Sequence, residues 1–129
     1  MVFESNDPEG SLGWSGVQNK VAKTTRACTY SRVGIMWSDP ADGPRNDKAI
    51  AYDLHVVLQK AGENPPFVLV GHSLGGLYTV IYTKYFGADV AGLVLVDPAH
   101  PDQVRRTEAI THRDFSALSP PEKILSKLA

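Results

Sequence analysis

The sequence predicts an α/β fold, in which a parallel sheet of about four strands carries helices on both faces. Short apolar runs alternate with segments of helical spacing along the first hundred residues. Strands that alternate with helices imply right-handed crossovers and parallel pairing. The run Phe67–Val70 is apolar throughout and passes at once into a helical pattern, which is typical of a central strand buried on both faces.

The first quarter of the chain is expected to give two strands and one helix. The apolar run Met1–Ser5 predicts a strand, and the dense turn signal Asn6–Gly10 ends it. A helix is indicated next by the spacing of Trp14, Val17 and Val21. A second strand is predicted at Ala27–Tyr30.

The middle of the chain contains the central strand and its two neighbouring helices. Residues 32–47 are rich in Gly, Pro, Asp and Asn, so we expect a loop. An amphipathic helix is predicted from Lys48, with Gly62 as its stop signal. After the strand at Phe67–Val70, a helix is expected from Leu74 onward.

The last part of the chain begins with a fourth strand. Gly92–Val96 is again apolar throughout, and the segment Asp97–Pro101 ends it sharply. A short helix is predicted around Gln103–Thr111. A second one is expected after Ser119–Glu122, which resembles a capping signal.

Composition describes an ordinary globular protein of 129 residues, which we expect to form a single domain. Hydrophobic residues make up 43% and charged residues 21%, and the net charge is −1. This balance gives no electrostatic footprint for nucleic acid or an anionic membrane, and no apolar stretch approaches a membrane span of ~20 residues. The single Cys28 is expected to be a buried core residue. No signal peptide is recognised at the N-terminus, so a cytoplasmic location is the expectation.

The junction between the central strand and its helix carries the clearest chemical signal. Gly71-His72-Ser73-Leu74-Gly75 matches the G-x-S-x-G nucleophile elbow in the strand-to-helix context that this motif requires. The turn would lift the Ser73 hydroxyl above the strand end. Side chains in place of the two glycines would collide with the neighbouring strand and helix. The backbone N–H of Leu74, at the helix N-terminus, could then face an oxyanion.

Four segments together resemble the α/β-hydrolase family, in particular its esterase-like and lipase-like members. They read V-F-E-S-N-D-P-E-G-S-L-G-W, C-T-Y-S-R-V-G-I-M-W-S-D, F-V-L-V-G-H-S-L-G-G and A-G-L-V-L-V-D-P-A-H-P-D-Q, in the order that the family uses. The resemblance implies a partial α/β-hydrolase fold, with Ser73 as nucleophile and the N–H of Leu74 as one oxyanion donor. It assigns the second donor to the N–H of Asp7. Residues 1–101 would then be the core, and residues 102–129 the start of a lid or a helical tail.

The general base is the open question, because family members usually supply their acid and histidine from segments beyond a lid. Asp97 and His100 follow Ser73 in the family's chain order and lie after the strand expected beside the elbow strand. His72 adjoins the nucleophile and is expected to pack or to contact substrate. The other two histidines are not expected to act as the base. We expect His55 to lie partly buried in a helix and His112 to lie on the surface.

These observations predict a serine hydrolase that acts on carboxylic esters through an acyl-enzyme, without a cofactor or metal. The segments that usually carry the family's acid and histidine are not recognised in this sequence. The alternative is therefore a catalytically silent hydrolase fragment, which folds and self-associates or binds small apolar ligands without turnover. In the family's strand order, the strands at Ala27–Tyr30 and Gly92–Val96 would be open edges. Open edges favour a homo-oligomer.

Overall fold

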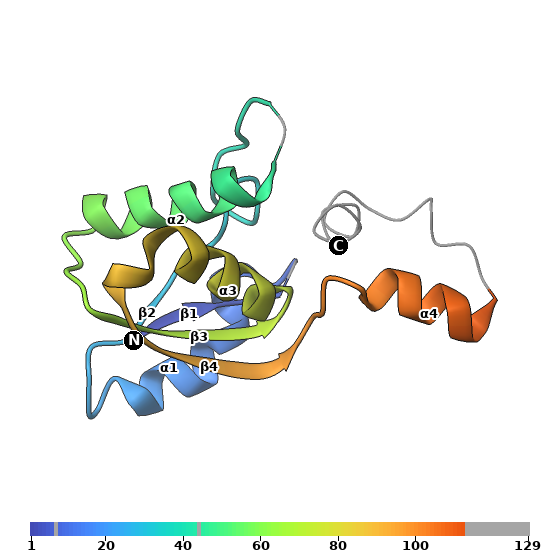
Figure 1. Cartoon of the computed structure of the whole chain (residues 1–129). Coiled ribbons are helices and arrows are strands. Elements are labelled where there is room, and N and C mark those ends of the chain that lie inside the picture. Colours follow the sequence, from blue (N-terminus) through green and yellow to red (C-terminus); the bar gives the residue numbers. More distant parts are fainter. Residues whose placement is uncertain (7, 44, 113–129) are drawn as a thin grey trace.

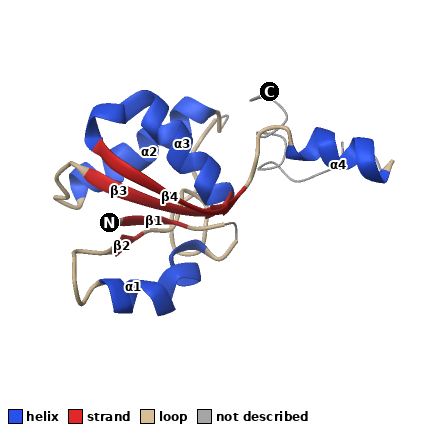
Figure 2. Cartoon of the chain, turned by 60° about the horizontal axis from the view of Figure 1, so that its bottom comes forward, coloured by secondary structure: helices blue, strands red, loops and turns tan. Residues whose placement is uncertain are grey.

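A computed structural model describes residues 1–6, 8–43 and 45–112, and Figures 1 and 2 show their parallel sheet between helices. The strands within these residues are β1 (Val2–Glu4), β2 (Cys28–Thr29), β3 (Phe67–Ser73) and β4 (Val90–Pro98). On one face lie α2 (Asp47–Lys60) and α3 (Leu74–Phe86), and on the other lies α1 (Ser15–Val21). The predicted fold class is confirmed. In the described part of the chain, no helix is long and apolar enough to cross a membrane.

The strand order is β2-β1-β3-β4, and every pairing is parallel. The two strands expected at the edges therefore lie at the edges of the described sheet. In the centre, β1 pairs with β3 so that Glu4 lies beside Gly71, and β3 pairs with β4 so that His72 lies beside Val96. Because the strands are parallel, the loops that leave their carboxyl ends gather at one side of the sheet, where α/β proteins bind ligands.

The hydrophobic core fills both sides of the sheet, but the larger part lies beneath α2 and α3. Alternate residues of each strand point to opposite faces, which divides β1 and β3 between the two layers. The layer under α2 and α3 contains Val2, Leu69, Leu54, Leu58, Tyr82, Phe67, Ile50, Ala51, Leu74, Leu77, Tyr78 and Ile81. The smaller layer on the α1 side contains Phe3, Val70 and Trp14.

Helix boundaries follow the expected signals closely. Asn46 caps α2, since its side chain accepts a hydrogen bond from the Ala49 N–H at 2.9 Å. A 3₁₀ turn, Gly10–Trp14, leads into α1, so Trp14 precedes the helix that its spacing predicted. The predicted helix α4 (Gln103–Thr111) lies beyond the end of β4, and its Val104 packs against the core cluster under α2 and α3.

The edge strands are more exposed than the centre of the sheet. The apolar run of β4, which we expected at an open edge, is between 38% and 44% exposed at its four large aliphatic residues (Leu93, Val94, Leu95, Val96). No described strand pairs with the outer edge of β4. The expectation that Cys28 is buried was wrong, because this residue lies in the short edge strand β2 and is half-buried. The helix expected after Ser119–Glu122 lies outside the described residues.

Candidate active site

Ser73 lies at the junction between β3 and α3, in a backbone conformation that few residues adopt. Its φ is 53° and its ψ is −122°, although it is not a glycine. Such backbone conformations cost of order 1–3 kcal/mol and persist only where the surrounding structure enforces them. The side chain makes no capping hydrogen bond to α3, and the residue is half-buried. The turn therefore holds the hydroxyl at the carboxyl end of the sheet without using it to stabilise the helix.

The glycines beside Ser73 are required by close contact, as the sequence predicted. A Cβ on Gly71 would lie 2.5 Å from the Gly75 carbonyl oxygen, and a Cβ on Gly75 would lie 2.2 Å from the Glu4 carbonyl oxygen. Both distances are far below van der Waals contact, and both obstacles are backbone atoms. The first turn of α3 can therefore lie directly against the end of β1 only because Gly75 carries no side chain, and against β3 only because Gly71 carries none.

His72 points away from α3 and lines a pocket on the α1 side of the sheet. The pocket has a volume of about 200 Å³, and its lining includes Ser5, Asn6, Trp14, His72 and Val96. The His72 ring meets the Trp14 indole edge-on, with 6.5 Å between ring centroids and 88° between planes. Ser5 Oγ and Trp14 Nε1 are buried without a hydrogen bond among the described residues. Such unpaired polar atoms are few in folded proteins and costly.

Asp97 is the penultimate residue of β4, which continues past the predicted end at Val96 to Pro98, and His100 follows two residues after the strand. The Ala99 N–H donates to the Ser73 carbonyl at 2.9 Å, which ties the two segments together. Asp97 is exposed with a φ of 43°, and His100 is also exposed. His100 Nδ1 accepts a hydrogen bond from the Asp102 N–H at 3.0 Å, so in this arrangement Nδ1 carries no proton. Among the described residues, no hydrogen bond joins the side chains of Ser73, Asp97 and His100.

The two predicted oxyanion donors come from different elements. Leu74 is the first residue of α3 and is 9% exposed, so its N–H lies at the helix N-terminus beside Ser73. Asp7 lies outside the described residues. The preceding residues of the same loop, Ser5 and Asn6, are described, and the Ser5 carbonyl lies close to the first turn of α3 at Gly75.

A buried polar network at the ends of β1 and β2 was missed by the sequence analysis. The Glu4 carboxylate is 1% exposed and accepts hydrogen bonds from the Tyr30 hydroxyl and from the Arg32 guanidinium. Arg32 also donates to the Ser5 carbonyl at 2.5 Å, and its guanidinium lies 4.7 Å from the centre of the Tyr78 ring. Burial raises the pKa of Tyr30 well above its usual value, and the Glu4 charge adds to this effect. A glutamate inside the apolar run of β1 was the available signal, because a buried carboxylate needs a cationic partner.

Comparison with known proteins assigns this arrangement to a family. A family model described as the alpha/beta hydrolase family matches residues 9–127. Over 103 residues the chain is 39% identical to a probable transporter, efuK, of Hormonema carpetanum, which covers 77% of this chain and 15% of that protein.

Solved structures agree in fold. The chain superposes with a TM-score of 0.72 on a thermophilic esterase from Thermogutta terrifontis, at 21% identity, covering 88% of this chain and 44% of the other. With the esterase RhEst1 from Rhodococcus sp. ECU1013 the TM-score is 0.68 at 29% identity, and the superposition covers 75% of this chain and 36% of the esterase chain. The chain thus spans less than half the length of each of these relatives. Because the family model covers most of the sequence and the sheet superposes on solved members, the protein belongs to the alpha/beta hydrolase family.

Proposed function

We propose that this chain carries the nucleophile part of a serine hydrolase that cleaves carboxylic esters through an acyl-enzyme. The observation that supports it most is the backbone at Ser73, where a non-glycine residue is held at a φ of 53° between a buried strand and a helix N-terminus. The close backbone contacts at Gly71 and Gly75, which leave no room for a side chain, support the same interpretation. Esterases among the structural neighbours support the same class of reaction.

In the proposed reaction the Ser73 hydroxyl oxygen attacks the ester carbonyl carbon, and the serine proton passes to a general base. The resulting oxyanion would accept hydrogen bonds from the N–H groups of Leu74 and Asp7. Collapse of the tetrahedral intermediate breaks the bond to the alcohol, which leaves with the proton held by the base. Water then attacks the acyl-enzyme with the same base, releasing the acid and restoring Ser73.

His100 is the proposed base, with Asp97 as the acid that orients it. The hydrogen bond between the Ala99 N–H and the Ser73 carbonyl keeps this loop beside the nucleophile. For Nε2 to accept the serine proton, the Nδ1 proton must be present, so His100 must release its hydrogen bond from the Asp102 N–H and turn towards Asp97. If that turn is not made, turnover depends on the oxyanion donors and binding alone.

The pocket beside His72 is the proposed site for part of the ester. It opens at the carboxyl end of the sheet and combines apolar walls from Trp14, Val17 and Val96 with polar atoms of the loop after β1. His72 would contact the substrate there rather than act as base, because its ring lies on the α1 side of β3 and packs on Trp14. A volume of about 200 Å³ favours a short acyl or alcohol group.

The test uses the purified chain with a fluorophosphonate probe and p-nitrophenyl esters of short acids. We expect labelling and hydrolysis in the wild type, loss of both in Ser73→Ala, and retention of both in Ser15→Ala, an exposed serine at the start of α1. His100→Ala is expected to remove most hydrolysis, because the serine proton then has no acceptor. Equal labelling in Ser73→Ala would refute the nucleophile assignment.

A second function follows from the exposed edge strand. The four aliphatic residues of β4 are more than a third exposed, and the outer edge of β4 is unpaired among the described strands. Such an edge favours pairing with another chain. A chain that self-associates at β4 and gives no labelling at Ser73 would fit the silent alternative rather than the hydrolase.

A further inference from the structure

We propose that Arg32 is a positioning residue, which orients the loop after β1 for oxyanion binding through the Ser5 carbonyl. The proposal rests on the proposed function, because that function places an oxyanion donor in this loop. Arg32 follows β2, and its side chain crosses the carboxyl end of β1 to reach the first loop residue. Its side chain is 12% exposed, so the contact is largely shielded from water.

The hydrogen bond from Arg32 to the Ser5 carbonyl also determines the direction of the next backbone N–H. The Ser5 carbonyl and the Asn6 N–H belong to one planar trans peptide, so they point in opposite directions. Arg32 Nη1 donates to the Ser5 carbonyl oxygen at 2.5 Å. A guanidinium that fixes this carbonyl therefore fixes the direction of the Asn6 N–H and the path by which the chain enters the loop.

Arg32 is itself held from two other sides. The same Nη1 donates to the Glu4 carboxylate, and the guanidinium lies over the Tyr78 ring, with 4.7 Å between Cζ and the ring centroid. Tyr78 is a buried residue of α3, the helix that begins next to Ser73. Glu4 is the last residue of β1 and is also fixed by the Tyr30 hydroxyl. The guanidinium thus connects β1, the loop after it, and the helix that carries the other proposed oxyanion donor.

The position of the loop relative to Ser73 makes small shifts important. The Ser5 carbonyl lies 2.9 Å from the point that a Cβ on Gly75 would occupy, so this peptide already lies against the first turn of α3. Electrostatic stabilisation of an oxyanion depends on donors aimed at it before the reaction. A misplacement of about 1 Å can cost about a hundredfold in rate. Loss of the Arg32 contact should therefore slow the chemical step more than it weakens substrate binding.

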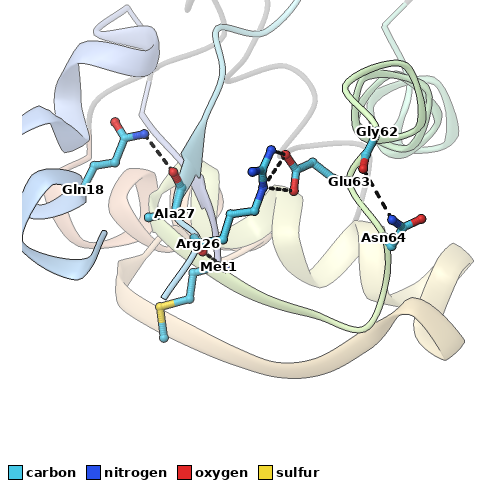
Figure 3. A network of polar contacts seen from close by, with 7 residues as sticks. All are labelled: Met1, Gln18, Arg26, Ala27, Gly62, Glu63 and Asn64. Carbon is cyan, nitrogen blue, oxygen red and sulfur yellow. Dashed lines mark hydrogen bonds and ion pairs between the residues drawn. The ribbon is translucent and has the colours of Figure 1, made fainter. Parts of the chain in front are cut away.

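The experiment compares Arg32→Met with a matched control, Arg26→Met. Arg26 also forms an ion pair, with Glu63 Oε2 at 2.7 Å from its Nε, but at the amino end of the sheet (Figure 3). Because Arg32→Met leaves the Glu4 carboxylate buried without its cation, it can fail to fold. The double variant Glu4→Gln with Arg32→Met removes both charges and serves as the second test.

Two readouts are taken on each folded variant: kcat and KM for a p-nitrophenyl ester, and the ¹⁵N order parameter of the Asn6 amide. We expect the double variant to lower kcat about 10- to 100-fold with KM within about twofold, and to lower the order parameter, while Arg26→Met changes neither. An unchanged Asn6 amide would overturn the proposal, as would a looser amide with unchanged kcat. If wild type shows no turnover that depends on Ser73, the hydrolase function fails, and the amide alone decides whether Arg32 orients the loop.

Discussion

Replacement of Gly75 by alanine tests the contact between β1 and the Ser73 turn. The added Cβ would lie 2.2 Å from the Glu4 carbonyl oxygen, 2.7 Å from its carbonyl carbon and 2.9 Å from the Ser5 carbonyl oxygen. Ordinary contact begins near 3.4 Å, so the overlap with the nearest atom is about 1 Å. All three obstacles are backbone atoms at the end of a strand that pairs on both sides, so no side chain can rotate to relieve the clash.

The expected cost of Gly75→Ala lies at or above the upper end for overpacked sites, about 3 kcal/mol in the free energy of unfolding. For a domain of this size that corresponds to a fall of roughly 10 °C in Tm. The assay is urea unfolding followed by circular dichroism, with fluorophosphonate labelling of the folded fraction. The control is Gly16→Ala in α1, where a Cβ would meet nothing within 4 Å, and we expect a gain of about 0.5 kcal/mol. A Gly75→Ala protein within about 0.5 kcal/mol of wild type would show that β1 does not lie against α3 as described.

Two further predictions concern the sheet edge and the core. Light scattering should find the wild-type chain dimeric or larger, and Val94→Lys on β4 should make it monomeric. The control is Val80→Lys on α3, which should leave the association intact although Val80 is 43% exposed and Val94 is 44% exposed. A monomeric wild type would contradict this prediction. Burial and the nearby Asp89 carboxylate raise the pKa of Tyr82 to about 12, so the folded state favours its neutral form. The contribution of Tyr82 to the free energy of unfolding should be constant below pH 10 and should be lost as pH rises from 10 to 12. In urea unfolding, the free energy of unfolding of Tyr82→Phe should therefore fall less steeply over this range than that of the wild type. Equal slopes would refute the assignment.

The fold could be predicted from sequence because its signals are local. The apolar run at Phe67–Val70, the helical spacing after Leu74 and the glycines around Ser73 each depend on neighbours within a few positions. The burial of Cys28 was predicted wrongly, because residue type reports how readily a side chain is buried, not whether its strand has a partner on both sides. An apolar strand that lies at an edge has the same sequence as one that lies in the centre.

Only the part of the candidate site that depends on adjacent residues could be predicted from the sequence. The turn at Ser73 is encoded by adjacent residues, whereas the network of Glu4, Tyr30 and Arg32 joins positions 26 and 28 residues apart. No periodicity links such residues, and only the presence of a carboxylate in an apolar strand hints that a partner exists. The side of the sheet to which His72 points follows from strand alternation, once β3 is known to continue to Ser73.

The central place of β1 in the sheet has a consequence for how the chain acquires its structure. Val2 pairs with Cys28 on one side and with Leu69 on the other, and the second partner is made 67 residues later. At about 5–20 residues per second, synthesis of that interval takes roughly 3–13 s. Throughout this time the strand has no partner on its β3 side, and pairing across so long a separation is intrinsically slow. Folding of this chain should therefore be limited by the arrival of β3, and a chaperone that shields the apolar N-terminal strand should raise the yield of native protein.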